Sequence, residues 1–127
     1  MQDKVTFEYT VIRVVPKVER EEFFNVGVLL YCKRKRFLRV QYFINPKKLD
    51  AFTHELDLEL LNTHLQSWTL ICKGDPDGGA IGKLELADRF RWLAACRSTV
   101  IQSSKTHSGL CEDPEGELKA LFEEYVL

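Results

Sequence analysis

Alternating apolar and polar positions dominate the first third of the chain. Over residues 5–15, β-branched and aromatic side chains recur with a period of two, which predicts a strand ending at Pro16. Residues 23–32 are apolar at almost every position, which is typical of a central strand buried on both faces. A third strand over 37–44 follows the basic turn at 33–36, so we expect an antiparallel hairpin.

The period changes to that of a helix after Asn45. A second helix is predicted over 84–95. For the first helix, Asn45 supplies a cap and Pro46 a proline in the first turn. The apolar stripe of this first helix recurs at three- and four-residue steps. It consists of Leu58, Leu61, Leu65, Trp68 and Cys72.

The last third of the chain adds a strand over 97–104 and a closing helix that starts at Asp113-Pro114. The order is strand, strand, strand, helix, helix, strand, helix. We therefore predict one α+β domain over residues 1–127, with a mainly antiparallel sheet of about four strands and the helices packed on one face.

Composition narrows the class of protein. The 127 residues are 45% hydrophobic and 29% charged with a net charge of −1, as in globular domains, which argues against a nucleic acid or a membrane as the main partner. No signal peptide or long apolar span is apparent. The scattered cysteines show no metal-binding spacing and fit a reducing cytoplasm, with no metal or cofactor expected. They are Cys32, Cys72, Cys96 and Cys111.

Residues 74–82 (GDPDGGAIG) have the composition of a loop. A phosphate-binding P-loop needs a glycine five residues before its Gly-Lys pair and Ser or Thr after it. Around Gly82-Lys83 these positions hold Asp77 and Leu84, so we expect a solvated turn.

A basic cluster occupies the predicted hairpin turn. Its four charges are candidates for nucleic-acid contact, since phosphates bind such patches. A hairpin tip is polar in any case, and charges there also prevent edge-to-edge aggregation. The cluster consists of Lys33, Arg34, Lys35 and Arg36.

The segment 89–107 places arginines beside hydroxyls, which is how phosphate and carboxylate sites are built. Its candidate binding residues are Arg89, Arg97, Ser98 and His107. The alternative is that these arginines pair with acids, such as Glu22 or those of the acidic C-terminal segment. We assign no catalytic residue.

Asn25 and Gly27 interrupt the second strand. A glycine inside an apolar strand indicates a bulge or the close approach of another backbone. Asn25 would either open a notch in the sheet, into which Arg13 points, or be a buried amide bonded to local backbone.

Three stretches together resemble the bacterial domain-of-unknown-function 3037 family: residues 9–16 (YTVIRVVP), 21–32 (EEFFNVGVLLYC) and 89–126, which begins RFRWLAACRSTV. The resemblance implies a small single-domain bacterial protein without an assigned activity. It also implies a partner, because some members are encoded beside kinase-like proteins of the toxin–antitoxin type. The polar positions that match are Arg13, Glu22, Asn25, Arg89, Arg97, Ser98 and His107, with Gly27 and Trp92 as structural companions.

Two functional hypotheses follow. The first is a non-catalytic protein-interaction or regulatory module of the bacterial cytosol, paired with a kinase-like partner. The second is a small phosphate- or nucleic-acid-processing enzyme that uses Arg89, Arg97, Ser98 and His107. A dimer through an exposed sheet edge or the face of Trp68 is left open.

Overall fold

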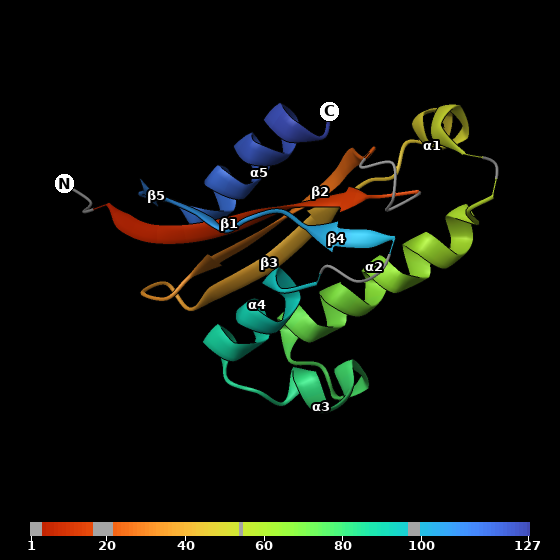
Figure 1. The fold of residues 1–127 in the computed structure, drawn as a ribbon. Helices are drawn as coiled ribbons and strands as arrows, with labels where there is room; N and C mark the ends of the chain where they lie inside the picture. The colour runs from red at the N-terminus through yellow and green to blue at the C-terminus, as the bar shows by residue number, and fades with distance from the viewer. Residues whose placement is uncertain (1–3, 17–21, 54, 97–99) are drawn as a thin grey trace.

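The structure is a computed structural model that describes residues 4–16, 22–53, 55–96 and 100–127. A twisted sheet forms its middle layer, and helices lie on both sides of it (Figure 1). The antiparallel α+β class predicted from the sequence is confirmed.

The sheet contains β1 (Val5–Val14), β2 (Phe24–Cys32), β3 (Phe37–Tyr42), β4 (Ile101–Ser103) and β5 (His107–Cys111). Its order is β3-β2-β1-β4, and β5 pairs with the same strand, β1. All pairs are antiparallel. The hairpin of the second and third predicted strands is confirmed, and β5 was not predicted. Of the fourth predicted strand, 97–99 lie outside the described residues, and within 100–104 the strand covers Ile101–Ser103.

Ser104 keeps β4 and β5 on one edge of β1, although residues 104–106 are not part of a strand. Its N–H donates to the carbonyl oxygen of Val11 at 2.8 Å. Its Oγ accepts from the N–H of Val11, also at 2.8 Å. The hydroxyl thus takes the place of a backbone carbonyl, so the ladder continues across the break.

The predicted helix after Asn45 is present as two helices. Asn45 Oδ1 accepts from the N–H of Lys47 at 2.9 Å and caps the first helix, as predicted. The expected loop over 74–82 contains two short helical turns. Among the residues that the structure describes, no helix is long and apolar enough to cross a membrane. The helices are α1 (Pro46–Phe52), α2 (Leu58–Lys73), η2 (Pro76–Gly78), α3 (Gly79–Gly82), α4 (Leu86–Ala94) and α5 (Pro114–Tyr125).

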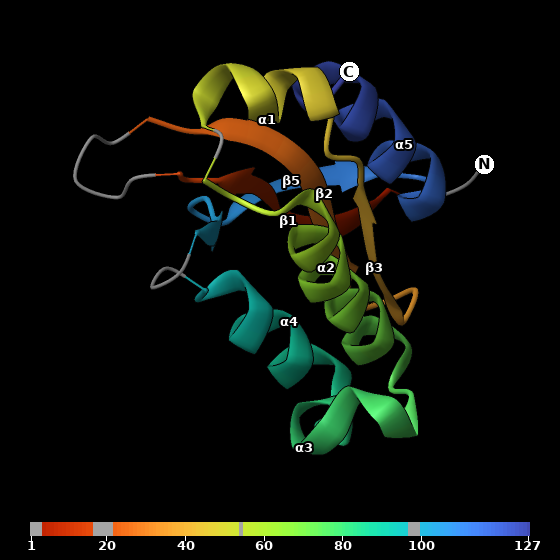
Figure 2. The ribbon, with the colours of Figure 1, turned by 90° about the vertical axis from the view of Figure 1, so that its right-hand side faces the viewer.

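The helices cover both faces of the sheet, not one face as we expected. In Figure 2, α5 lies above the sheet and α2, α3 and α4 lie below it. The reason is β2, which is buried along both faces and so needs cover on each. The core under α5 includes Val5, Phe7, Val28, Leu30, Leu118 and Phe122. The core under α2 and α4 includes Ile12, Val14, Leu29, Leu65, Trp68, Phe90 and Leu93.

A bulge in β2 explains Gly27. Ile12 pairs with Gly27 but Arg13 pairs with Asn25, so Val26 is the extra residue. A Cβ on Gly27 would lie 2.8 Å from the carbonyl oxygen of Gln41, in β3. Both the bulge and the close backbone approach that the sequence indicated at Gly27 are therefore present.

Candidate functional site

Asn25 lies at the end of α5, and Arg13 is its register partner in β1. Asn25 Nδ2 donates to the carbonyl oxygen of Tyr125 at 3.1 Å, and Lys48 Nζ donates to that of Val126 at 3.4 Å. The Arg13 guanidinium lies 4.0 Å from the centre of the Phe23 ring. The side chain of Asn25 thus satisfies a helix-end carbonyl. Asn25 is half-buried and its partner lies 100 positions away in the sequence, so it is not the buried, locally bonded amide considered above.

Arg89 is a structural cap of α2. Its Nη1 donates to the carbonyl oxygens of Ile71 and Cys72, each at 2.9 Å. Its Nε donates to the carbonyl oxygen of Leu84 at 3.0 Å. One guanidinium therefore ties the end of α2 to the loop before α4.

His107 belongs to the other side of the sheet. Its ring lies 5.3 Å from that of Tyr9, and the Tyr9 hydroxyl lies 3.5 Å from the hydroxyl of Tyr125 in α5. Burial and this hydroxyl contact raise the pKa of Tyr9 to about 12. Arg89 belongs to the α2–α4 layer, so the structure does not bring it and His107 together, while Arg97 and Ser98 lie outside the described residues.

The remaining predicted residues are scattered. Glu22 is exposed just before β2. Trp92, expected to be a structural companion, is 51% exposed, whereas Trp68 is buried at 2% and offers no surface for a dimer. The basic cluster is the exposed turn between β2 and β3, as the hairpin interpretation predicted.

Arginines of the basic segments do find acidic partners. Arg91 forms a bidentate pair with Glu8, in which Nη1 and Nη2 each lie 3.0 Å from a carboxylate oxygen. Arg39 pairs with Glu115 at 2.9 Å. The Arg91–Glu8 pair links α4 to β1, and the Arg39–Glu115 pair links α5 to β3.

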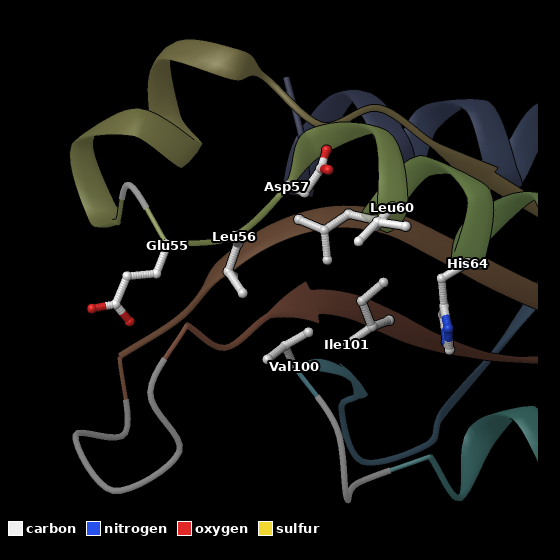
Figure 3. Close-up of a pocket in the computed structure, with 8 residues that line it drawn as sticks. Glu55, Leu56, Asp57, Leu60, His64, Val100 and Ile101 are labelled. Carbon is white, nitrogen blue, oxygen red and sulfur yellow. The ribbon is translucent and has the colours of Figure 1, made fainter.

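A hollow on the surface, lined mainly by apolar side chains, was not predicted. It lies between the start of α2 and the start of β4 and has a volume of about 330 Å³. In Figure 3, Leu56 points down into it, and Val100 and Ile101 point up from below. We call this hollow the α2–β4 groove. Its lining residues are Glu55, Leu56, Asp57, Leu60, Leu61, His64, Val100 and Ile101.

The α2–β4 groove has an apolar floor and an open wall. Ile101 and Leu61, which are 1% and 5% exposed, form part of the core beneath it. Leu60 is 69% exposed, so a large apolar side chain stands in solvent beside the floor. His64 closes one end, and its ring lies 6.5 Å from that of Trp68.

Acidic side chains surround the start of the groove. Glu55 and Asp57 line it, and Glu59 follows in the first turn of α2. The carboxylate of Asp57 accepts from the N–H of Glu59 at 2.9 Å and so caps α2. An apolar surface bordered by negative charge suits an apolar group with positive neighbours.

One sequence signal pointed to the groove. Leu60 lies outside the core stripe of α2, and Leu56, Leu60 and His64 recur at steps of four. This second stripe marks an apolar side chain that the core does not use. Its opposing wall, Val100, is about forty positions away and could not be assigned from spacing.

The structure offers no metal centre within its described residues, where no group of three or more His, Cys, Asp or Glu side chains is suitably placed. None of the four cysteines, all of which the structure describes, forms a disulfide. Burial raises the pKa of Cys72 to about 12, although the nearby Arg89 acts in the opposite direction. The Cys72 thiol is therefore protonated at neutral pH.

Comparison with known proteins gives one match. No curated protein and no solved structure matches the chain. A protein family described as protein of unknown function (DUF3037) matches residues 9–126, nearly the whole length. This span contains the β2 bulge, the α2 cap at Arg89 and the α2–β4 groove, and the chain belongs to the DUF3037 family.

Proposed function

We propose that this protein is a non-catalytic interaction module, and that the α2–β4 groove binds an apolar segment of a protein partner with lysine or arginine beside the apolar residue. The observation that carries the proposal is Leu60, which is 69% exposed beside an apolar floor. Large apolar side chains that border a concave surface are typical of protein-binding sites.

The shape of the surface favours an extended segment. A second hollow of about 410 Å³ lies between α1 and the start of α2, and Leu56 lines both hollows. A peptide crossing Leu56 would place apolar side chains in both. A compact small molecule would fill only one of them.

The charges favour a basic flank. Glu55, Asp57 and Glu59 cluster at the start of α2, whereas the neighbouring hollow is lined by one charge of each sign, Lys47 and Asp50. Opposite charges at the rim of an interface raise the association rate and select the partner. A segment with acidic flanks would be repelled.

The contacts of Arg89 and His107 do not favour the enzymatic alternative, whose other two residues, Arg97 and Ser98, lie outside the part of the chain that the structure describes. Arg89 donates to three backbone carbonyls, and His107 lies on the opposite side of the sheet. Catalytic groups must meet within hydrogen-bond reach of ~3 Å around a substrate. We therefore do not propose a reaction.

A random peptide library selected on the immobilised protein tests the proposal. We expect enrichment of sequences with a large apolar residue beside lysine or arginine. Leu60→Lys should weaken their binding about tenfold or more, because it removes apolar burial and adds a repelling charge. Leu127→Lys is the matched control, since Leu127 is 71% exposed and lines neither hollow.

Two results would overturn the proposal: no enriched sequence, or enriched peptides that bind the Leu60→Lys variant as well as the unchanged protein. The kinase-like partner of toxin–antitoxin type remains a prediction. Co-purification of such a protein with the Leu127→Lys variant but not with the Leu60→Lys variant would place it at the groove.

A further inference from the structure

β4 and β5 together form one outer edge of the sheet, on the same side of β1. Only the β4 half of this edge is covered. Along β4, the N–H of Ser103 donates to the carbonyl oxygen of Cys96 at 2.8 Å. Cys96 Sγ donates to the carbonyl oxygen of Ile101 at 3.3 Å. Cys96, which follows α4, therefore covers this edge. Among the described residues, β5 has no pairing strand other than β1.

The register shows which groups of β5 face outward. The backbone groups of Val11 and Val15 point toward the β4–β5 side of β1. The carbonyl oxygen of Val11 accepts from the N–H of Ser104, and the N–H of Val15 donates to the carbonyl oxygen of Val100. By alternation, Tyr9 and Phe7 do the same toward His107 and Gly109, their register partners. The N–H and C=O groups of Ser108 and Leu110 then point away from β1.

The β5 edge carries none of the usual protective features. Its sequence, His-Ser-Gly-Leu-Cys, contains no charged residue and no proline. Leu110 is 63% exposed, and Ser108 is exposed as well. Natural edge strands normally carry lysine, proline or a covering segment to prevent pairing with another chain.

We propose that β5 pairs with β5 of a second copy of this chain, antiparallel about a two-fold axis at Gly109, so that one sheet runs through the dimer. Ser108 of each copy exchanges backbone hydrogen bonds with Leu110 of the other. The two Gly109 residues then form a non-hydrogen-bonded pair, in which the backbones approach most closely. A residue without a Cβ suits this position.

Charge complementarity selects a second copy as the occupant. Lys105 precedes β5, whereas Glu112 and Asp113 follow it. Antiparallel self-pairing places the Lys105 end of one copy against the acidic end of the other, and it does so twice because the contact is symmetric. The axis at Gly109 places Lys105 opposite Asp113, and both residues are exposed.

Sedimentation equilibrium over a range of protein concentrations tests the dimer. Ser108→Pro should raise the dimer dissociation constant about tenfold or more, since it removes an outward N–H from each copy. Ser108→Ala keeps that N–H and should leave the constant unchanged. Leu110→Lys, which opposes like charges across the axis, should also favour the monomer.

A charge exchange checks the orientation. Lys105→Glu should weaken the dimer, and the double variant Lys105→Glu with Asp113→Lys should restore it, because the axis at Gly109 places these two positions opposite each other. Circular dichroism confirms that each variant is folded. A chain that stays monomeric at the highest concentration, or a dimer that Ser108→Pro leaves intact, would overturn the proposal.

The dimer and the α2–β4 groove are independent. Leu60→Lys should leave self-association unchanged, because Leu60 lies on α2 and not at the β5 edge. Leu110→Lys should leave binding of the selected peptides unchanged. Each proposal can therefore fail without the other.

Discussion

On the α5 side of the sheet, one helix covers the core and its last carbonyls are bound by Asn25 and Lys48. On the other side, α2 and α4 cover a larger core, and Arg89 joins α2 to the loop before α4. Both sides use side-chain donors at helix ends. Of the two, the α2 side includes an open apolar groove, so the more heavily covered face is also the one with room for a partner.

Gly27→Ala should have the largest effect, because β2 serves both faces. The new Cβ would lie 2.8 Å from the Gln41 carbonyl oxygen and 2.9 Å from Tyr42 Cβ. We expect a loss of about 2–3 kcal/mol in the free energy of unfolding, measured with urea. Gly116→Ala is the control: its Cβ would meet only the side chain of Asp113, which can move aside, and it lies in helix α5, where alanine is favoured over glycine, so we expect little or no loss. Equal losses would contradict the close approach at Gly27.

Arg89→Met and Asn25→Ala should separate the two faces. Arg89→Met leaves the carbonyls of Ile71 and Cys72 without their donor and should cost about 2 kcal/mol, whereas Asn25→Ala removes one hydrogen bond and should cost about 1 kcal/mol. Hydrogen exchange should quicken at the end of α2 in the first variant and at the end of α5 in the second. Faster exchange at both ends in either variant would show that the two layers unfold together.

The Arg89→Lys variant tests the shape of the donor. Lysine keeps the charge but cannot hold the planar fork that reaches Ile71, Cys72 and Leu84. We expect the Arg89→Lys variant to have a lower free energy of unfolding than the unchanged protein. Full stability in this variant would mean that charge alone matters at this position.

The two ion pairs should contribute less. Arg91 and Glu8 form a bidentate pair with side chains 56% and 26% exposed, while Arg39 and Glu115 are 53% and 73% exposed. Arg91→Gln should cost about 0.5–1 kcal/mol and Arg39→Gln about half as much or less. Both losses should shrink in 1 M salt, and a salt-independent loss would point to packing instead of charge.

The smallest effect at physiological pH concerns buried thiols. Burial raises the pKa of Cys72 from 9.0 to about 12, so below pH 9 the thiol is protonated in folded and unfolded chains alike. Between pH 9 and 12 the unfolded chain releases the proton and the folded chain keeps it, so stability falls as pH rises. Cys72→Val should reduce the slope of unfolding free energy against pH in this range. An unchanged slope would show that Cys72 does not contribute.

The strand and helix pattern could be predicted where one periodicity was clear. Gly27 was recognised because a glycine weakens an apolar strand unless a bulge or a close backbone approach requires it. Asn45 was recognised because a cap followed by proline is a specific signal. The apolar run over 23–32 indicated a strand buried on both faces. Such a strand needs helices on both sides of the sheet, although we expected them on one face only. β5 has no β-branched residue, and it is a strand only because β1 pairs with it.

The candidate site was harder to predict because its parts come together only in the fold. The segment around Arg89 had the composition of an anion site. Arg89 instead binds backbone carbonyls, which every residue has, so the residue types at positions 71 and 72 could not identify them as its partners. Leu60 was visible as an apolar residue outside the stripe of α2. Val100 and Ile101, which complete the groove, carry no signal that connects them with α2.

The Ser104 contact with Val11 has a consequence for synthesis of the chain. The two residues are separated by 93 positions. On its other side, β1 pairs with β2, which is the next strand in the chain. As the chain leaves the ribosome, the β1–β2 hairpin can form early, but the second edge of β1 has no partner until almost the entire chain has been made. Contacts of such long sequence separation form slowly, and the nascent protein needs protection against aggregation during that interval.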